Sequence, residues 1–430
     1  MWPITPAGGF EFRIRARAEE HGKAEKPMIL IFEMTWTGTV HAPVNCGVIQ
    51  FVARAWPEQQ VRVHADPTHL AELQRDRALT ALPNIAFVPI EVSQRYRGRT
   101  HMVSFPRFWQ EFRIVQTALR KAPRKAGCLV LLTSTTATGT FAAAYAASLS
   151  RRRVGVQIGL HGNLSDATGW RPRNPLVRAF DTLSALQARF RVPVRFLVLE
   201  PAIRTSLQSA LPAAAARTDV VRHPINAAEI PAGDPPVPLP PIRVGFVGLG
   251  SEAKGFPTFL DIAARVKARH GDRIAFVHIG IVQAGKTAGC DVLEDPPTKE
   301  HLSRAEFARR LAALHYVFLP FRRGYYDLSA SGALIDAVTW LKPIITMRVP
   351  LSEQFFAESG EIGFLCEDEA SMEAAVETAL TEIDPGRYAR QVDALRAARD
   401  ARRTEVLAAA YREAVELGFP RLLERPGRPG

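Results

Sequence analysis

Short apolar runs recur along the chain and are separated by segments of helix length. The first run, Met28-Ile29-Leu30-Ile31-Phe32, has no polar position, as expected for a strand that is buried on both faces of a parallel sheet. Similar runs follow over residues 61–64, 85–90, 128–133, 154–160 and 195–199. This alternation of buried strands and helices predicts a doubly wound α/β domain.

A proline-rich stretch over residues 223–241 interrupts the pattern, because repeated proline blocks both helix and central strand. The strand pattern restarts at 242–247 and continues at 274–279, 316–321, 343–347 and 363–366. We therefore expect a Rossmann-like domain over 27–222, a linker over 223–241 and a second Rossmann-like domain over 242–386. Residues 387–430 are helical in composition and could cross back to the first domain. Residues 1–26 show little periodicity and are expected to form a poorly ordered leader.

Composition agrees with a globular protein of two domains. The chain has 430 residues, 47% of them hydrophobic and 23% charged. No apolar run is long enough to span a membrane and no secretory signal is visible, so we expect a cytoplasmic protein. The four cysteines are far apart and match neither a disulfide framework nor a metal site, which indicates a packing role.

The formal net charge of +12 is spread unevenly. The segment from Arg95 to Lys125 contains nine Lys or Arg residues and a single acid, Glu111. Part of this region, residues 107–121, has the spacing of an amphipathic helix, with Trp109 placed to lie at a membrane boundary. The helix either packs on its own sheet with a solvated basic face or docks on anionic lipid, where it would bring a lipid-linked acceptor to the protein. Aromatic residues are not interleaved as stacking platforms, which argues against nucleic acid.

A block of glycines follows the strand at 242–247. Gly248, Gly250 and Gly255 surround Lys254 just before a helix-like segment. A strand that ends in glycines and enters a helix exposes backbone N–H groups and the positive end of the helix dipole, which suits a diphosphate. The alternative is an ordinary tight turn between strand and helix.

A second block follows the strand at 316–321. It holds a polar loop with Arg322 and Arg323, and then an apolar helix that Ser331-Gly332 opens and that carries Asp336. The serines, Ser329 and Ser331, either cap this helix or help to bind phosphate oxygens. The two arginines are either ligand contacts or a solvated loop.

Together these two blocks resemble the donor half of the GT-B glycosyltransferases, in particular the retaining enzymes of family 4. Lys254-Gly255 stands where that family has Lys-Gly before the first helix, and Asp336 stands at the second of two acids. The resemblance covers residues 242–368 well and the N-terminal half loosely. It implies two Rossmann-like domains that face each other across a cleft.

The resemblance also implies roles for the donor-site residues. Lys254, Arg322 or Arg323 and the N–H groups around Gly250 and Gly332 would stabilise the departing diphosphate, Asp336 would bind the ribose, and Asp327 the sugar hydroxyls. Ser329 and Ser331 belong to the same donor site. No metal or cofactor is needed, since fixed positive charge takes its place.

The chain departs from the family pattern at two positions. Leu249 stands where an arginine is usual, and the first acid is displaced, because the eight-residue position is Leu328 and the nearest acid is Asp327. Both acids are also Asp where Glu is usual. A non-catalytic GT-B-like protein that binds a nucleotide sugar therefore remains an alternative. A nucleotide-sugar 2-epimerase is another, although it would need carboxylates and histidines that we cannot assign.

Two turns in the N-terminal half follow predicted strands. Gly38 and Thr39 stand where such an enzyme brings acceptor and leaving phosphate against backbone N–H groups, unless Gly38 is a simple turn glycine. His161 follows the strand at 154–160 and is similar to the histidine that many family members place beside the sugar, unless it is structural. We expect transfer of a sugar from a nucleotide-diphosphate donor to a glycan or lipid-linked acceptor, with retention implied by the resemblance alone.

Overall fold

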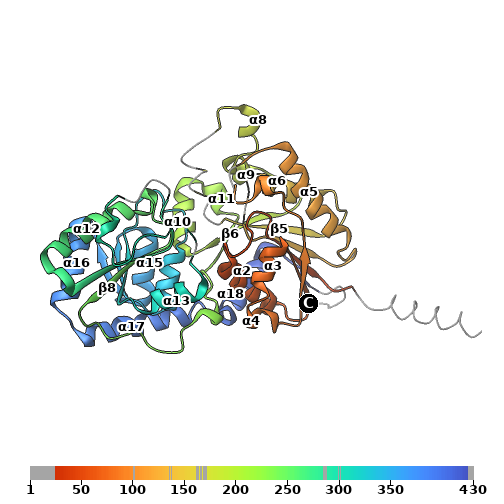
Figure 1. Cartoon of the computed structure of the whole chain (residues 1–430). Helices are drawn as coiled ribbons and strands as arrows, with labels where there is room; N and C mark the ends of the chain where they lie inside the picture. Colours follow the sequence, from red (N-terminus) through yellow and green to blue (C-terminus); the bar gives the residue numbers. More distant parts are fainter. Residues whose placement is uncertain are drawn as a thin grey trace, which may run out of the picture.

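Two parallel β-sheets with helices on their faces form two lobes of the molecule (Figure 1). The structure is a computed structural model, and it describes residues 25–99, 102–134, 136, 138–160, 164, 167, 172–283, 288–298, 300 and 302–424.

The N-terminal lobe is built on a seven-stranded parallel sheet in the order β3-β2-β1-β4-β5-β6-β7. The strands are β1 (Met28–Phe32), β2 (Gln60–Ala65), β3 (Ile85–Pro89), β4 (Cys128–Leu132), β5 (Val154–Gly159), β6 (Val194–Leu199) and β7 (Thr218–Val221). The apolar runs predicted all of them except β7. This strand is short and contains Asp219, whose buried carboxylate accepts hydrogen bonds from Gln157 of β5 and Arg195 of β6.

Helices cover both faces of this sheet, and alternate strand residues feed two separate cores. Ile29 and Ile31 pack with α2 (Ala42–Ala55), α3 (Pro67–Leu73) and α18 (Thr404–Gly418), whereas Leu30 and Phe32 pack with α5 (Phe105–Arg120) and α6 (Gly139–Ser148). The described part of the lobe also has shorter helices: α4 (Arg77–Thr80), α8 (Pro175–Arg178), α9 (Thr182–Gln187), α10 (Pro201–Ala210), α11 (Pro212–Ala215) and the 3-10 turn η1 (Gln94–Tyr96).

The C-terminal lobe has a five-stranded parallel sheet in the order β12-β11-β10-β8-β9. Its strands are β8 (Ile242–Val247), β9 (Ile274–Ile279), β10 (Tyr316–Leu319), β11 (Ile344–Met347) and β12 (Gly363–Cys366). Its helices are α12 (Phe256–His270), α13 (Arg304–Ala312), α14 (Gly332–Thr339), α15 (Pro350–Ser359) and α16 (Glu369–Thr381), with turns η3 (Glu252–Lys254), η4 (Gly271–Arg273) and η5 (Cys290–Val292). The prediction of two doubly wound sheets is confirmed.

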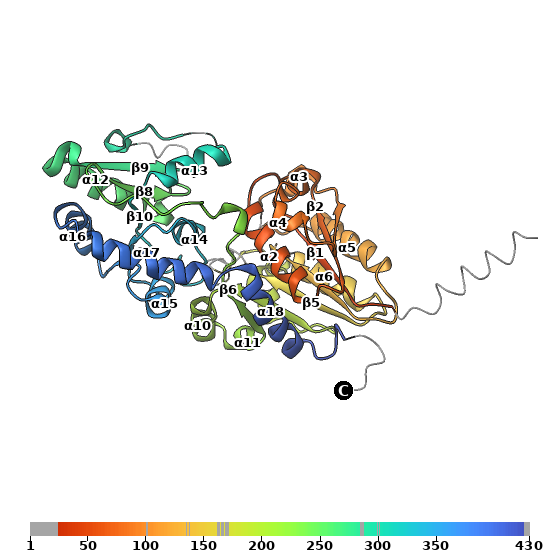
Figure 2. The same ribbon diagram turned by 90° about the horizontal axis from the view of Figure 1, so that it is seen from below.

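The chain passes between the lobes twice. The first passage contains η2 (Ala227–Glu229) and the proline-rich segment, and the second joins α17 (Pro385–Asp400) to α18. α17 packs on α14 and α15 of the C-terminal lobe, whereas α18 packs on α2 of the N-terminal lobe (Figure 2). The end of the described chain therefore belongs to the N-terminal lobe.

A buried ion pair lies where these passages meet. Arg402, between α17 and α18, is 1% exposed, and its Nη2 lies 3.2 Å from Oε2 of the equally buried Glu200 at the end of β6. Gln354 of α15 donates to the same Glu200 oxygen at 2.8 Å, and the Arg402 guanidinium stacks on Phe355. Side chains of both lobes thus share one buried carboxylate.

None of the helices in the described part of the chain is long and apolar enough to cross a membrane.

Candidate functional site

The first glycine block forms a tight turn at the carboxyl end of β8. Gly248 has φ +103° and Gly255 has φ +76°, conformations that favour glycine. A Cβ on Gly255 would lie 2.3 Å from the backbone oxygen that follows β10, so no side chain fits there. The turn brings Lys254 Nζ to 3.7 Å from the place of a Gly248 Cβ. The Gly250 amide donates to the Ile281 carbonyl at 2.8 Å and is therefore already engaged.

Lys254 and Asp336 lie close enough for their charges to interact. Burial lowers the pKa of Lys254, and the Asp336 charge opposes this shift. Burial raises the pKa of Asp336 to about 6, against the opposing charges of Arg304 and Lys254. Arg304, the first residue of α13, also pairs with Glu229 of η2. At the carboxyl edge of this sheet, Lys254 and Arg304 therefore lie within electrostatic range of a carboxyl group whose ionisation is costly.

The amino end of α14 opens onto free space beside these charges. Ser331 is its N-cap, and its Oγ accepts the Leu334 amide at 3.2 Å. A Cβ added to Gly332 would meet nothing within 4 Å. Ser329 and Ser331 are both buried. The capping role of Ser331 is thus observed, and the backbone at Gly332 remains approachable.

The loop between β10 and α14 holds the displaced acid. Asp327 Oδ2 accepts the Gly324 amide at 2.9 Å, while its Oδ1 is buried and has no hydrogen-bond partner among the described residues. Arg322 and Arg323 have exposed side chains. Of the two alternatives that the sequence allowed, ligand contacts or a solvated loop, the exposure of both side chains agrees with the solvated loop.

The same loop contacts the opposite lobe. Leu328 belongs to the core cluster that α5 and α6 form with the N-terminal sheet, and Ala330 packs against that cluster. The segment between Asp327 and Ser331 therefore lies at the boundary between the lobes.

A buried carboxylate organises the loop that follows β1 on the N-terminal lobe. Glu33 accepts five hydrogen bonds, from the amides of Thr35 and Trp36 and from the side chains of Asn45, Thr133 and Ser134. These donors come from three neighbouring segments. Glu33 therefore ties the loop to α2 and to the end of β4.

Gly38, at the tip of this loop, is held by α3. Its amide donates to Thr68 Oγ1 at 3.1 Å, and its carbonyl lies 2.8 Å from His69 Nδ1. His69 Nε2 lies 3.0 Å from Asn45 Nδ2, so a neutral ring with its proton on Nδ1 satisfies both contacts. Gly38 has φ +57° and open space around it, and Thr39 is exposed. The Gly38 amide is thus already engaged, whereas the Thr39 side chain reaches solvent.

His41 lies within electrostatic range of the C-terminal lobe. It is the N-cap of α2 with φ 60°, and its ring stacks on Trp36 with centroids 4.6 Å apart. Burial lowers the pKa of His41 to about 4, and the charge of Lys254 adds to this effect. Because Lys254 belongs to the other lobe, the loop after β1 and the turn after β8 approach each other.

The site thus combines predicted residues with two that sequence reasoning missed. Lys254 and Asp336 were predicted, whereas Arg304 and His41 were not. Two signals were available in the sequence. Arg304 directly follows Ser303, which caps a helix, and His41 comes three residues after Gly38. His161 lies outside the described residues.

The basic region between Arg95 and Lys125 is not one surface. Arg107 is buried, with its Nε 2.9 Å from Glu111 Oε1, and Arg97 pairs with Asp66. Lys121 lies beyond the other end of α5, beside a hollow at the amino edge of the sheet. The sequence pattern could not show that one arginine of the amphipathic helix turns inward to pair with its only acid.

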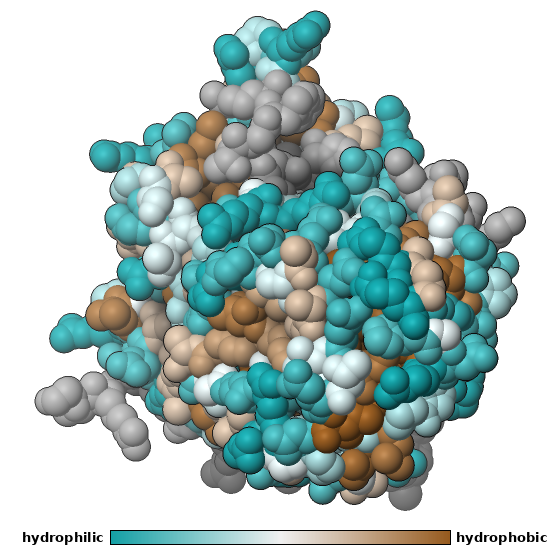
Figure 3. Space-filling view, turned by 90° about the vertical axis from the view of Figure 1, so that its left-hand side faces the viewer, coloured by the Kyte–Doolittle hydropathy of each residue, from teal (hydrophilic) through white to brown (hydrophobic). Residues whose placement is uncertain are grey.

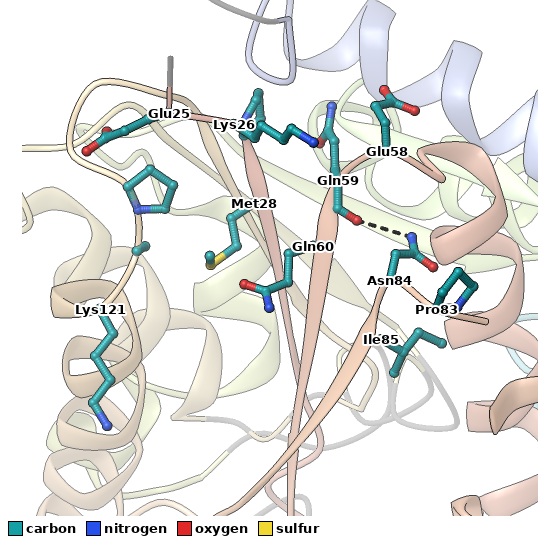
Figure 4. A pocket seen from close by; sticks show the side chains of 13 residues that line it. Glu25, Lys26, Met28, Glu58, Gln59, Gln60, Pro83, Asn84, Ile85 and Lys121 are labelled. Atoms are coloured by element: carbon teal, nitrogen blue, oxygen red, sulfur yellow. Dashed lines mark hydrogen bonds between the residues drawn. The ribbon is translucent and has the colours of Figure 1, made fainter. Parts of the chain in front are cut away.

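That hollow, of about 620 Å³, lies away from the site (Figure 4). It is lined by the first residues of β1, β2 and β3 and by Glu25, Lys26, Asn84 and Lys121. The Asn84 side chain donates to the Gln59 carbonyl, as the dashed line marks. Since ligands of open parallel sheets bind at the carboxyl ends of strands, this hollow is at the wrong edge for the chemistry.

Among the residues that the structure describes, no cluster of three or more His, Cys, Asp or Glu side chains is placed to hold a metal ion.

The chain matches no protein-family model and no curated protein sequence. Solved structures match over nearly the whole chain. One match is a structure described as "Trehalose-6-phosphate from E. coli bound with UDP-2-fluoro glucose". It has a TM-score of 0.60 at 10% identity, over 91% of this chain and 99% of that one. WaaG, a glycosyltransferase involved in lipopolysaccharide biosynthesis, has a TM-score of 0.58 at 12% identity, over 90% and 99%.

A UDP-N-acetylglucosamine 2-epimerase assigned in Listeria monocytogenes matches with a TM-score of 0.52 at 14% identity, over 92% of this chain and 96% of that one. At such identities the likeness concerns the fold. The two facing parallel sheets are those of the GT-B architecture.

Proposed function

We propose that this chain, which has the GT-B fold, is a glycosyltransferase that moves a sugar from a nucleoside-diphosphate donor to an acceptor hydroxyl. The observation that supports the proposal most directly is the arrangement of Lys254, Arg304 and Asp336 at the carboxyl edge of one sheet, with His41 of the other lobe nearby. The fold neighbours include a structure that holds a UDP-sugar analogue, which makes UDP the first nucleotide to test.

The barrier to sugar transfer lies in separating an oxocarbenium-like sugar from a departing diphosphate. Catalysis of this step consists mostly of stabilising negative charge on phosphate oxygens. Lys254 would neutralise that charge from the C-terminal lobe, and the open backbone at Gly332 would donate hydrogen bonds to it. A diphosphate beside His41 would raise the pKa of the ring, so that this histidine could hold a proton against the leaving group.

The remaining roles follow the family resemblance. Asp336 would bind the ribose hydroxyls, Asp327 would accept a sugar hydroxyl at its unpaired Oδ1, and His161 would lie beside the sugar. Arg322 and Arg323 would contact the phosphates from the exposed loop between β10 and α14. We propose a metal-independent reaction with retention at the anomeric carbon.

The acceptor would enter from the N-terminal lobe. A groove of about 400 Å³ adjoins the Gly38 loop and is lined by Asp66, Thr68, Glu91, Arg97 and nearby apolar residues. Carboxylates, a hydroxyl and a guanidinium suit a hydroxyl-rich glycan. We propose a glycan or lipid-linked acceptor in polysaccharide or glycoconjugate synthesis, and a cytoplasmic protein that works at the inner face of the membrane.

A thermal-shift screen with the diphosphates of uridine, guanosine and adenosine and with their sugars tests the donor site. At 100 times its dissociation constant, a true donor stabilises the fold by about 2.7 kcal/mol. The shift should disappear in Lys254→Ala and persist in Lys267→Ala, a control on α12 whose ammonium donates to the Val292 carbonyl. No shift with any nucleotide at millimolar concentration contradicts the proposal.

Two alternatives predict different products. The epimerase fold neighbour supports a nucleotide-sugar 2-epimerase, which would interconvert two nucleotide sugars without an acceptor. Leu249 and the displaced acid support a non-catalytic protein, which would bind the nucleotide sugar and release nothing. Release of free nucleoside diphosphate that requires an acceptor distinguishes transfer from both.

A further inference from the structure

Large apolar side chains are exposed together on one side of the N-terminal lobe. We call this surface the aromatic patch, and it consists of Phe105, Trp109, Tyr145, Leu149, Leu176 and Phe180. Phe105 is 74% exposed, Leu176 78% and Trp109 48%. These residues come from α5, α6 and the segment around α8, which lie together in the upper part of the lobe in Figure 1.

Ring contacts join the aromatic members of the patch. The Phe108 ring lies 6.2 Å from Phe105, 6.2 Å from Tyr145 and 6.1 Å from Phe180, measured between centroids. Phe190 continues the cluster, because its ring lies 6.4 Å from that of Tyr145. Segments distant in sequence therefore contribute rings to a single aromatic cluster.

Cations accompany the patch, and acids do not face solvent in its three segments. Arg113 is exposed one helical turn after Trp109, Arg178 is exposed just before Phe180, and Arg189 and Arg191 flank Phe190. The only acids within residues 105–121, 139–153 and 173–193 are Glu111 and Asp181, and both are buried. Glu111 is also neutralised by Arg107 at 2.9 Å.

The outer face of the C-terminal lobe looks different. Figure 3 shows this side of the molecule, where hydrophilic residues predominate and hydrophobic ones form scattered patches. Between residues 242 and 400, Leu249 is the one large hydrophobic side chain in the described residues that counts as exposed, at 37%. The aromatic patch is therefore a local feature of one lobe and not a general property of the surface.

We propose that the aromatic patch docks this protein on an anionic lipid bilayer. Trp, Tyr and Phe rings with aliphatic Leu149 and Leu176 suit the boundary between headgroups and acyl chains, and the surrounding arginines suit anionic headgroups. Single-stranded nucleic acid would use the rings for stacking but gain little from exposed leucines. A protein partner would need acidic residues opposite these arginines, whereas a lipid surface supplies negative charge everywhere.

Docking through this patch would orient the boundary between the lobes. The patch rests on the core cluster of α5 and α6, which Leu328 of the other lobe also contacts. A bilayer at the patch would therefore lie on the lobe that the acceptor is proposed to enter. The lipid-linked nature of the acceptor rests on the proposed function, whereas the docking itself does not.

Vesicle flotation with the full chain tests this proposal. The protein should float with vesicles of phosphatidylcholine and 30% phosphatidylglycerol, and not with phosphatidylcholine alone. A double variant, Phe105→Ser with Trp109→Ser, should reduce the bound fraction at least tenfold, and Arg113→Glu with Arg189→Glu should do the same at low salt. Melting temperatures and UDP shifts should stay at wild-type values, because these side chains are exposed and lie outside the donor site.

Matched controls are Leu417→Ser, an 80% exposed leucine on α18, and Arg273→Glu, an exposed arginine of the C-terminal lobe. Both should bind vesicles like the wild type. The proposal is overturned if anionic vesicles do not bind the wild type, if the controls lose as much binding as the patch variants, or if single-stranded RNA competes the vesicles away from the patch. A lost UDP shift with intact vesicle binding would count against the donor site alone.

Discussion

Asp336 has a carboxyl group whose burial disfavours its charged form. Burial raises its pKa to about 6 even though Arg304 and Lys254 lie near. The folded state therefore holds the proton between about pH 4 and pH 6, where the unfolded chain has released it. It follows that Asp336 makes the protein less stable as the pH rises through this window, and that this loss is complete above pH 6.

Asp336→Asn should consequently stabilise the ligand-free protein above pH 6, by about 1–3 kcal/mol, because asparagine has no charge to bury. The gain should shrink below pH 6 and vanish near pH 4. Urea denaturation at pH 4.5 and pH 7.5 measures it. The same variant should weaken nucleotide binding if the carboxylate holds the ribose. A variant that is less stable than the wild type at pH 7.5 would contradict the conclusion that burial disfavours the charged form of Asp336.

Single residues were predictable where their signal is local. Lys254 and Asp336 follow strands, glycines and a helix cap within a few positions, so the pattern alone indicated them. Arg304 and His41 could not be predicted, because their importance comes from residues that are far away in sequence. The inward turn of Arg107 was hidden for the same reason, since a helical pattern does not reveal which polar side chain finds a buried partner.

At the scale of elements, the loop after β1 depends on one buried carboxylate. Glu33 accepts its hydrogen bonds from two amides of the loop, one side chain of α2 and two side chains after β4. A glutamine at this position would replace one carboxylate oxygen by an NH2 group, which would then lie against groups that also donate hydrogen bonds. The loop carries Gly38 and His41, so its shape controls the N-terminal side of the site.

Glu33→Gln should therefore lower the free energy of unfolding by about 2 kcal/mol and loosen the loop. Hydrogen exchange followed by mass spectrometry should show faster exchange of the amides at 35–41 than in the wild type. Glu58→Gln, at an exposed glutamate before β2, serves as the control and should change neither quantity. Unchanged exchange in Glu33→Gln would mean that the loop is held by other contacts.

Strands were predicted more completely than helices or loops. Continuous apolar runs indicate buried parallel strands directly, and the runs at 28–32, 242–247, 274–279 and 363–366 have the bounds that the structure shows. The exception is β7, whose Asp219 breaks the apolar run and is compensated by partners on β5 and β6. Such compensation depends on tertiary contacts that no local pattern records.

At the scale of the whole molecule, the two lobes share a buried ion pair. Glu200 directly follows β6 of the N-terminal sheet, Gln354 belongs to the C-terminal lobe, and Arg402 lies in the passage between them. Removing only the cation would leave a buried carboxylate with no charged partner, which is costly.

Arg402→Met should accordingly destabilise the protein by about 3–5 kcal/mol. Adding Glu200→Leu should recover part of this loss, because it removes the unpaired charge. Arg403→Ala, at the exposed neighbour that pairs with Asp400, should have little effect. Chemical denaturation of the four proteins gives the comparison. Equal stability of Arg402→Met and the wild type would show that the pair does not hold the lobes together.

The central claim is that Lys254 of one lobe and His41 of the other lie at one anion site between them. Calorimetric titration of UDP, GDP and ADP tests it most directly, with the wild type, Lys254→Ala and His41→Asn, where asparagine tolerates the left-handed backbone at the cap. We predict that one of the nucleotides binds the wild type and that each variant binds it at least tenfold more weakly. Wild-type affinity in either variant, or no binding by the wild type at millimolar nucleotide, would contradict the account.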